Sequence, residues 1–173
     1  MKKILALILT IHVATGSMIF GNPSDHQMKV AKFPSSDLTN FIAAIAPIKA
    51  SFLKRSETAE RDIQRICKSL RDRRHPNLKL KKAALHNIKK TQADVDALKN
   101  IAISFQNSSD ALVRQLSEEF ITLHKHATAM LKHEERFVTA PRKFTHADGA
   151  LLRKYTDMFR KQCERIDKLI NEA

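Results

Sequence analysis

Apolar residues recur every three or four positions along most of the chain, in long stretches separated by short polar or proline-containing segments. This spacing places them on one face of an α-helix. The first stretch begins after Ser36 and continues to His75, where Pro76 disfavours further helix. Pro47 lies inside it and predicts either a kink or the start of a new helix there, and the unbroken apolar stripe favours the kink.

Three further stretches follow, and their joints carry helix-end signals. The second begins at Leu78 and ends before the polar segment 106–110, which offers a stop and a fresh N-cap. The third ends at Pro141, and Thr145 with Asp148 has the spacing of a capping box for the last helix. The stripes predict a buried core that includes Ile63, Ile66, Leu85, Ile88, Phe120, Leu123, Phe159 and Ile166.

The last three stretches are each close to 28 residues long, and residues 47–75 of the first match that length. Equal amphipathic helices with short joints favour an up-down-up-down bundle. The sequence therefore predicts an all-α protein, a four-helix bundle with a flexible N-terminal leader. The expected organisation is a signal peptide over 1–21, the flexible leader over 22–36 and the helical bundle domain over 37–173. The alternative is a coiled coil in which 77–138 is one continuous helix that dimerises; Asn107, Ser108 and Ser109 argue against it.

The first residues have the layout of a secretory signal peptide. Lys2 and Lys3 precede an apolar run over 4–13, and small residues follow, with cleavage expected after Gly16 or, preferably, Gly21. A bilayer-spanning helix needs roughly 20 apolar residues, so this run is too short to be an anchor. We expect an exported protein, periplasmic or secreted, with no transmembrane segment in the mature chain.

Composition excludes several function classes. Three glycines in 173 residues leave no phosphate-binding glycine-rich loop. There is no tryptophan and one tyrosine, so aromatic stacking platforms for sugars or single strands are not expected. The sequence around His133 lacks the second histidine of a zinc protease, and no serine or cysteine nucleophile pattern occurs. We therefore expect no catalytic residues, no cofactor and no enzyme activity.

A dense basic segment is the strongest functional signal. The chain carries a net charge of +13, and between Arg65 and Lys90 ten Lys or Arg residues stand against one acid, Asp72. Cations are favoured at a helix C-terminus but disfavoured at a helix N-terminus, where the lysines after Asn77 lie. The sequence predicts an anion-binding site whose partner is an anionic surface, a glycan or an acidic protein, with an ordinary solvated turn as the alternative. The predicted residues are Arg71, Arg73, Arg74, Lys79, Lys81 and Lys82.

Histidines and cysteines give weaker signals. His126, Met130 and His133 share one helix face, but Met130 falls on the apolar stripe, so His126 and His133 are only weak candidates and no metal site is predicted. In the predicted bundle, Cys67 and Cys163 differ in height by about 13 Å, too far for a strain-free disulfide. Free thiols, a bridge made by sliding the helices and an intermolecular bridge all stay open.

Together these patterns predict an exported helical-bundle interaction protein whose basic end contacts an anionic surface or partner. The alternative is a helical bundle that carries a small ligand or a metal ion between its helices. The two hypotheses differ in their expectations. The first predicts binding that depends strongly on salt, whereas the second predicts an interior pocket and a ligand that survives purification.

Overall fold

The computed structural model describes residues 35–72 and 74–171, and helices dominate this part of the chain. The helices are α2 (Ser36–Arg71), α3 (Leu78–Ser104), α4 (Ala111–Thr139) and α5 (His146–Asn171). No strand occurs within the described residues. The prediction of an all-α protein is confirmed, whereas the predicted signal peptide and almost all of the predicted leader lie outside the described residues.

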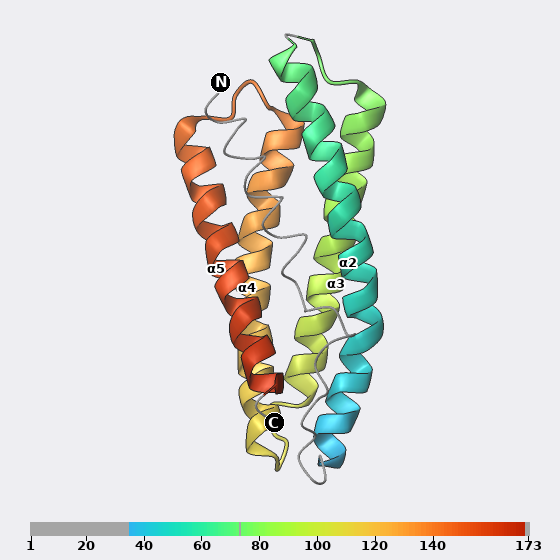
Figure 1. The fold of residues 1–173 in the computed structure, drawn as a ribbon, viewed down its shortest axis with the longest axis vertical. Coiled ribbons are helices and arrows are strands. Elements are labelled where there is room, and N and C mark those ends of the chain that lie inside the picture. The colour runs from blue at the N-terminus through green and yellow to red at the C-terminus, as the bar shows by residue number, and fades with distance from the viewer. Residues whose placement is uncertain (1–34, 73, 172–173) are drawn as a thin grey trace.

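The helices lie side by side along their length (Figure 1). The turn between α2 and α3 and the loop between α4 and α5 lie at one end of the body, and the α3–α4 loop lies at the other. α3 packs against α2 and α4, and α4 packs against α5. The outer helices α2 and α5 meet through the rings of Phe52 and Phe159, whose centroids are 6.1 Å apart.

Side chains at the starts of α3 and α5 satisfy N–H groups of the first turn, at α5 as the sequence predicts and at α3 through a cap that was not predicted. The Asn77 side chain accepts a hydrogen bond from the N–H of Lys79 at 2.8 Å and caps α3. At the start of α5, the Asp148 carboxylate accepts from the N–H of Thr145 at 2.8 Å, and the Asp148 N–H donates to the Thr145 hydroxyl at 3.2 Å. This reciprocal pair confirms the predicted capping box.

Side-chain hydrogen bonds join the capped starts of α2 and α4 across the end of the body. Ser35 caps α2, and its hydroxyl donates to the carboxylate of Asp110, which caps α4. The Ser108 hydroxyl donates in turn to the carboxylate of Asp37 in the first turn of α2. We call this end, defined by Ser35, Asp37, Ser108 and Asp110, the capped end.

Two sequence alternatives are wrong. α2 is continuous through Pro47, so no new helix starts there, and it ends at Arg71, four residues before His75. Residues 105–110 are not helical, so 77–138 is not one long helix. The polar segment 106–110 provides the physical reason, because Asp110 satisfies the first N–H groups of α4 through Leu112 and Val113.

The core is the predicted one with two corrections. Seven of the eight predicted core residues are buried, and the eighth, Leu85, is half-buried and packs against the core. Leu78, expected on the inner stripe of α3, is 66% exposed. It is the first residue of its helix, and periodicity states which face a residue occupies but not whether a neighbouring element covers that height.

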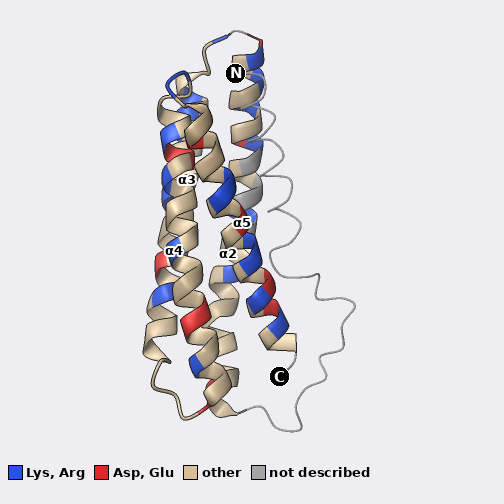
Figure 2. Cartoon of the chain, turned by 90° about the vertical axis from the view of Figure 1, so that its left-hand side faces the viewer, with Lys and Arg blue, Asp and Glu red and all other residues tan. Residues whose placement is uncertain are grey.

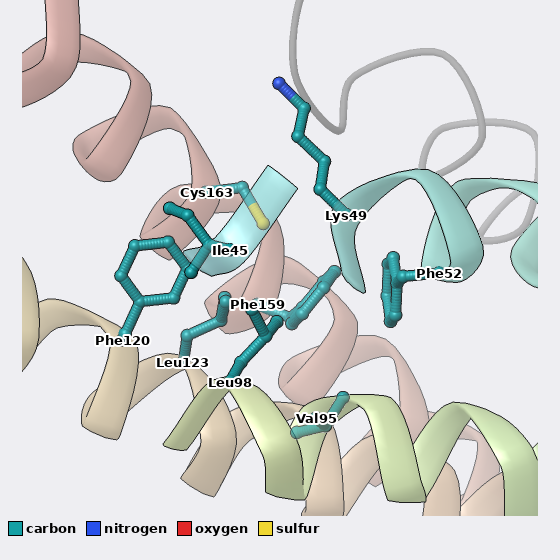
Figure 3. A pocket seen from close by; sticks show the side chains of 9 residues that line it. All are labelled: Ile45, Lys49, Phe52, Val95, Leu98, Phe120, Leu123, Phe159 and Cys163. Carbon is teal, nitrogen blue, oxygen red and sulfur yellow. The ribbon is translucent and has the colours of Figure 1, made fainter. Parts of the chain in front are cut away.

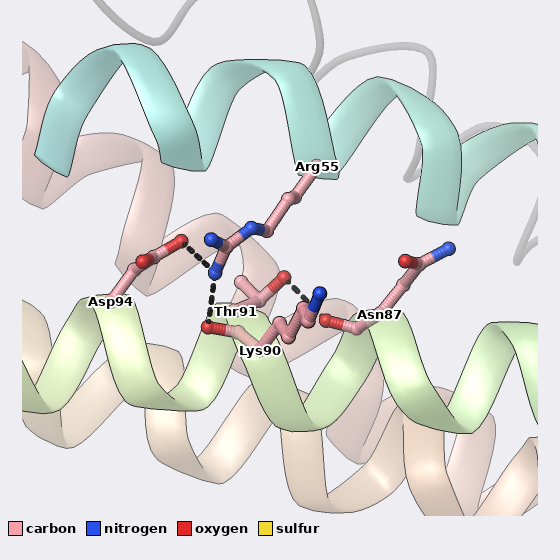
Figure 4. A network of polar contacts seen from close by, with 5 residues as sticks. All are labelled: Arg55, Asn87, Lys90, Thr91 and Asp94. Carbon is pink, nitrogen blue, oxygen red and sulfur yellow. Dashed lines mark hydrogen bonds and ion pairs between the residues drawn. The ribbon is translucent and has the colours of Figure 1, made fainter.

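Aromatic clusters and polar contacts join the helices. Phe41 makes edge-to-face contacts with Phe105 and Phe120, at centroid distances of 5.3 and 5.6 Å. Between α2 and α3, one guanidinium nitrogen of Arg55 donates to the Lys90 carbonyl at 2.9 Å and to the Asp94 carboxylate at 2.8 Å (Figure 4).

None of the helices in the described residues is long and apolar enough to cross a membrane.

Candidate anion-binding pole

The predicted cations gather at one end of the body because α2 ends and α3 begins there. Arg71 lies in the last turn of α2, Arg74 lies in the turn, and Lys79 and Lys81 lie in the first turn of α3, with Lys82 directly after them. All are exposed except Lys81, which is half-buried. Arg73 lies outside the described residues, so its placement stays a prediction.

The α4–α5 loop adds two cations that the sequence prediction did not include. Arg142 and Lys143 are exposed and follow Pro141 at the same end of the body (Figure 1). The Lys81 ammonium donates a hydrogen bond of 2.9 Å to the carbonyl of Thr139, the last residue of α4. This contact links the first turn of α3 to the end of α4, so the cations of the two neighbouring joints share one surface. We call it the basic pole, and its residues are Arg71, Arg74, Lys79, Lys81, Lys82, Arg142 and Lys143.

A shallow hollow lies between the two loops of the basic pole. Its empty volume is about 520 Å³, including open solvent. Lys81, Arg142 and Lys143 line it together with exposed His75. The remaining lining is apolar and consists of Leu70, Pro76, Ala140 and Pro141. The hollow therefore combines cations with apolar walls.

Part of the basic segment lies elsewhere. Lys90 is the thirteenth residue of α3, which places it about 18 Å along the helix axis from the pole. Lys89 precedes it, and Arg65 and Lys68 lie on the exposed surface of α2 before its end. The cations of the dense sequence segment are thus spread along α2 and α3, and only some of them lie at the pole. The α4–α5 loop adds the other cations of the pole.

The basic pole keeps an excess of positive charge within the described residues, because its seven cations stand beside one exposed acid, Asp72, which follows Arg71 at the end of α2. None of the seven cations forms an ion pair there, and the first turn of α3 contains no acidic residue. Asp148, in the first turn of α5, forms an ion pair with Arg136 at 2.7 Å. Hydrogen bonds from the Thr145 hydroxyl and N–H, then Arg136, lower the pKa of Asp148. Blue segments mark Lys and Arg at this end, whereas the α3–α4 loop is largely tan (Figure 2).

The histidines do not converge on a metal position. His124 contacts the Asp96 carboxylate at 2.8 Å on α3, whereas His133 stacks on Tyr155 of α5 with ring centroids 5.6 Å apart. Burial, with a smaller contribution from Lys125, lowers the pKa of His126. Met130 is buried, as its position on the apolar stripe predicts. Among the described residues, no group of three or more His, Cys, Asp or Glu side chains could hold a metal ion.

Both cysteines are buried free thiols. Burial raises the pKa of Cys67 to about 12, so this thiol is protonated and unreactive at neutral pH. Burial likewise raises the pKa of Cys163. The prediction that the two do not bridge in this arrangement agrees with these unpaired thiols.

Cys163 lines an apolar cavity in the middle of the body, to which all four helices contribute (Figure 3). The cavity offers water-sized molecules about 20 Å³, room for about one water. Lys49 stands at its edge with its ammonium directed away from the apolar side chains. An organic ligand would require the helices to move apart, which disfavours the hypothesis of a small-ligand carrier.

Sequence reasoning missed Arg142 and Lys143, although a signal for them existed. They directly follow the proline that ends the third helix, and with short joints every second joint falls at the same end of the body.

No protein-family model matches the chain, and no curated protein or solved structure matches it either.

Proposed function

We propose that this chain is an exported interaction protein that binds an anionic surface or partner through the basic pole. The proposal includes the finer fold, an up-down-up-down four-helix bundle with a flexible N-terminal leader. In such a bundle the first and third joints share one end, which gathers cations from two separate stretches of sequence into one surface.

The observation that carries the proposal is the excess of positive charge at the basic pole, where Asp72 offsets only one of the cations. Seven cations stand there without an ion pair among the described residues. Lys79 and Lys81 occupy the first turn of α3, where the helix dipole disfavours cations by about 0.3–1 kcal/mol each. Mutual repulsion adds to that cost, and an anionic partner would offset both.

Export supports the proposal from the other end of the chain. The basic start, the apolar run over 4–13 and the small residues after it are typical of a secretory signal. An exported basic protein meets lipid headgroups and acidic glycans, and electrostatic attraction accelerates its association with them. Mass spectrometry of the exported protein tests this part, because cleavage after Gly16 or Gly21 changes the mass by a known amount.

A binding comparison tests the pole itself. The native protein and a triple variant, with Lys79, Lys81 and Lys82 changed to Gln, are compared for binding to anionic vesicles and to a sulfated polysaccharide such as heparin. The matched control changes three exposed lysines in the middle of the body. These are Lys54, Lys125 and Lys161, which give the same change in net charge.

We expect the pole variant to bind at least one of the two anionic ligands much more weakly than the control variant. Binding should also fall steeply with salt, because exposed charges are screened over about 8 Å at physiological ionic strength. Equal loss in both triple variants would show that net charge alone drives binding. That result, or the absence of any binding at low salt, would refute the proposed function.

A further inference from the structure

An exposed leucine stands among the cations of the basic pole. Leu78 is 66% exposed, the highest value among the large apolar side chains that the structure describes as exposed. It lies at the first position of α3, directly before Lys79 and close to Lys81 and Lys82. A side chain so exposed contributes little to folding and is open to contact with a partner.

Leu78 is not the only apolar side chain at the basic pole. Pro76 lines the hollow between the two loops, together with Leu70, Ala140 and Pro141. Cations surround these side chains, because Lys81, Arg142 and Lys143 line the same hollow. The surface therefore combines cations with apolar side chains, at Leu78 and in the hollow.

A lipid bilayer has the matching arrangement of chemistry. Its phosphate groups lie at the surface, and its acyl chains begin a few ångströms below them. Peripheral proteins bind such interfaces by combining cations near the headgroups with apolar side chains that reach the acyl boundary. A nucleic acid or a sulfated glycan would be complementary to the cations alone and would leave Leu78 in water.

We infer that the basic pole docks end-on against a bilayer rich in anionic phospholipid, with Leu78 inserted among the headgroups. This inference rests on the proposed function and names its partner. The contact is peripheral, because none of the described helices is long and apolar enough to cross a membrane. Each lysine at the surface contributes about fivefold to partitioning, so the attachment is reversible by salt.

The sequence offers a direct probe of this contact, because the chain contains no tryptophan. A Leu78→Trp variant reports from the basic pole alone. Its matched control is Ile103→Trp, at the opposite end of the same helix, where Ile103 is 45% exposed. Both full-length variants are titrated with vesicles of equal parts phosphatidylglycerol and phosphatidylcholine, and with vesicles of phosphatidylcholine only.

We expect the emission of Leu78→Trp to shift to shorter wavelength and to become shielded from acrylamide on the anionic vesicles only. Ile103→Trp should show neither change. Every variant carries the same residues 1–34, so any membrane affinity of that segment is common to the two proteins. A shift at both positions, or at neither while the protein is vesicle-bound, would overturn the inference.

A second pair of variants measures what Leu78 contributes. Leu78→Ala should weaken partitioning to anionic vesicles about five- to tenfold, because a half-inserted leucine loses most of its apolar area. It should leave heparin binding unchanged, and Ile103→Ala should change neither. Circular dichroism of each variant checks that the helices are retained.

The outcomes separate this inference from the proposed function. Lysine-dependent binding to heparin, with no binding to anionic vesicles, would overturn the bilayer inference and leave the proposed function standing. Vesicle binding that is indifferent to Leu78→Ala would also overturn the insertion. Failure to bind either ligand would remove both proposals together.

Discussion

At the capped end, two side-chain hydrogen bonds join the starts of α2 and α4. The Ser35 hydroxyl donates to Asp110, and the Ser108 hydroxyl donates to Asp37. Arg114 adds contacts to the carbonyls of Ser108 and Ser109. At the basic pole, by contrast, seven cations lie on the end of α2, the start of α3 and the two loops. Among them, Lys81 at the start of α3 donates to the carbonyl of Thr139 at the end of α4.

The contrast separates groups that hold the fold from groups available to a partner. A carboxylate at a helix N-terminus is favoured by the dipole and by the free N–H groups. The lysines of α3 meet neither condition, although Asn77 supplies the cap itself. Helix capping therefore explains the polar residues of the capped end by their contribution to stability. It does not explain the lysines of the basic pole.

We expect the largest loss of stability from a substitution in the core near the capped end. Phe120 is buried against Phe41 in an edge-to-face contact at 5.6 Å. Phe120→Ala should lower the free energy of unfolding by about 3–5 kcal/mol, because it leaves a cavity in a closely packed core. Urea denaturation measures this. A loss below about 1 kcal/mol would contradict the described packing.

The next largest effect is expected from removing the Asp110 carboxylate, which caps α4 and accepts the hydrogen bond from Ser35. Asp110→Ala should cost about 1–2 kcal/mol of unfolding free energy, because it removes the cap of α4 together with the acceptor of the Ser35 hydroxyl. Asp110→Asn is the control, since asparagine caps helices about as well. If both substitutions had the same large cost, the charge of Asp110 would matter more than its capping hydrogen bonds.

At the basic pole we expect the opposite sign. Changing Lys79, Lys81 and Lys82 to Gln should raise stability by up to about 1 kcal/mol at low salt, because it removes cations from a helix N-terminus. The mid-body triple change at Lys54, Lys125 and Lys161 should raise it less. Thermal unfolding at two salt concentrations compares them. Destabilisation by the pole variant would show that its lysines serve the fold.

The smallest expected effect is a dependence on acid. Hydrogen bonds, chiefly from Ser35, lower the pKa of Asp110, and those from Thr145 lower the pKa of Asp148. A lowered pKa in the folded state means that each carboxylate stabilises the protein above the ordinary pKa of about 4 and stops doing so as pH falls below it. The melting temperature should therefore drop between about pH 5 and pH 2.

Asp148→Asn isolates the contribution of the α5 capping box to that titration. The variant should be less stable at neutral pH, and its melting temperature should fall less on acidification, because a carboxylate with a lowered pKa is gone. An unchanged pH profile would indicate that Asp148 does not contribute to acid unfolding.

Most of the fold was predictable because its determinants are local. The helical periodicity, the caps at Asn77 and Asp110 and the box between Thr145 and Asp148 depend on residues a few positions apart. The candidate site was only partly predictable. The basic segment after Arg65 was evident, but its division between the pole and the sides of α2 and α3 depends on where each helix ends.

The sequence alone determined the helical class, the inward faces and the excess of positive charge, since these follow from residue type and short-range spacing. Only the tertiary structure decided that Arg142 and Lys143 join the lysines of α3, that Leu78 is exposed, and that His124 and His133 turn to different helices. The physical reason is that these outcomes depend on contacts between elements distant in the chain. Hydrophobic periodicity orients a helix about its own axis, but it does not specify which neighbour lies beside it.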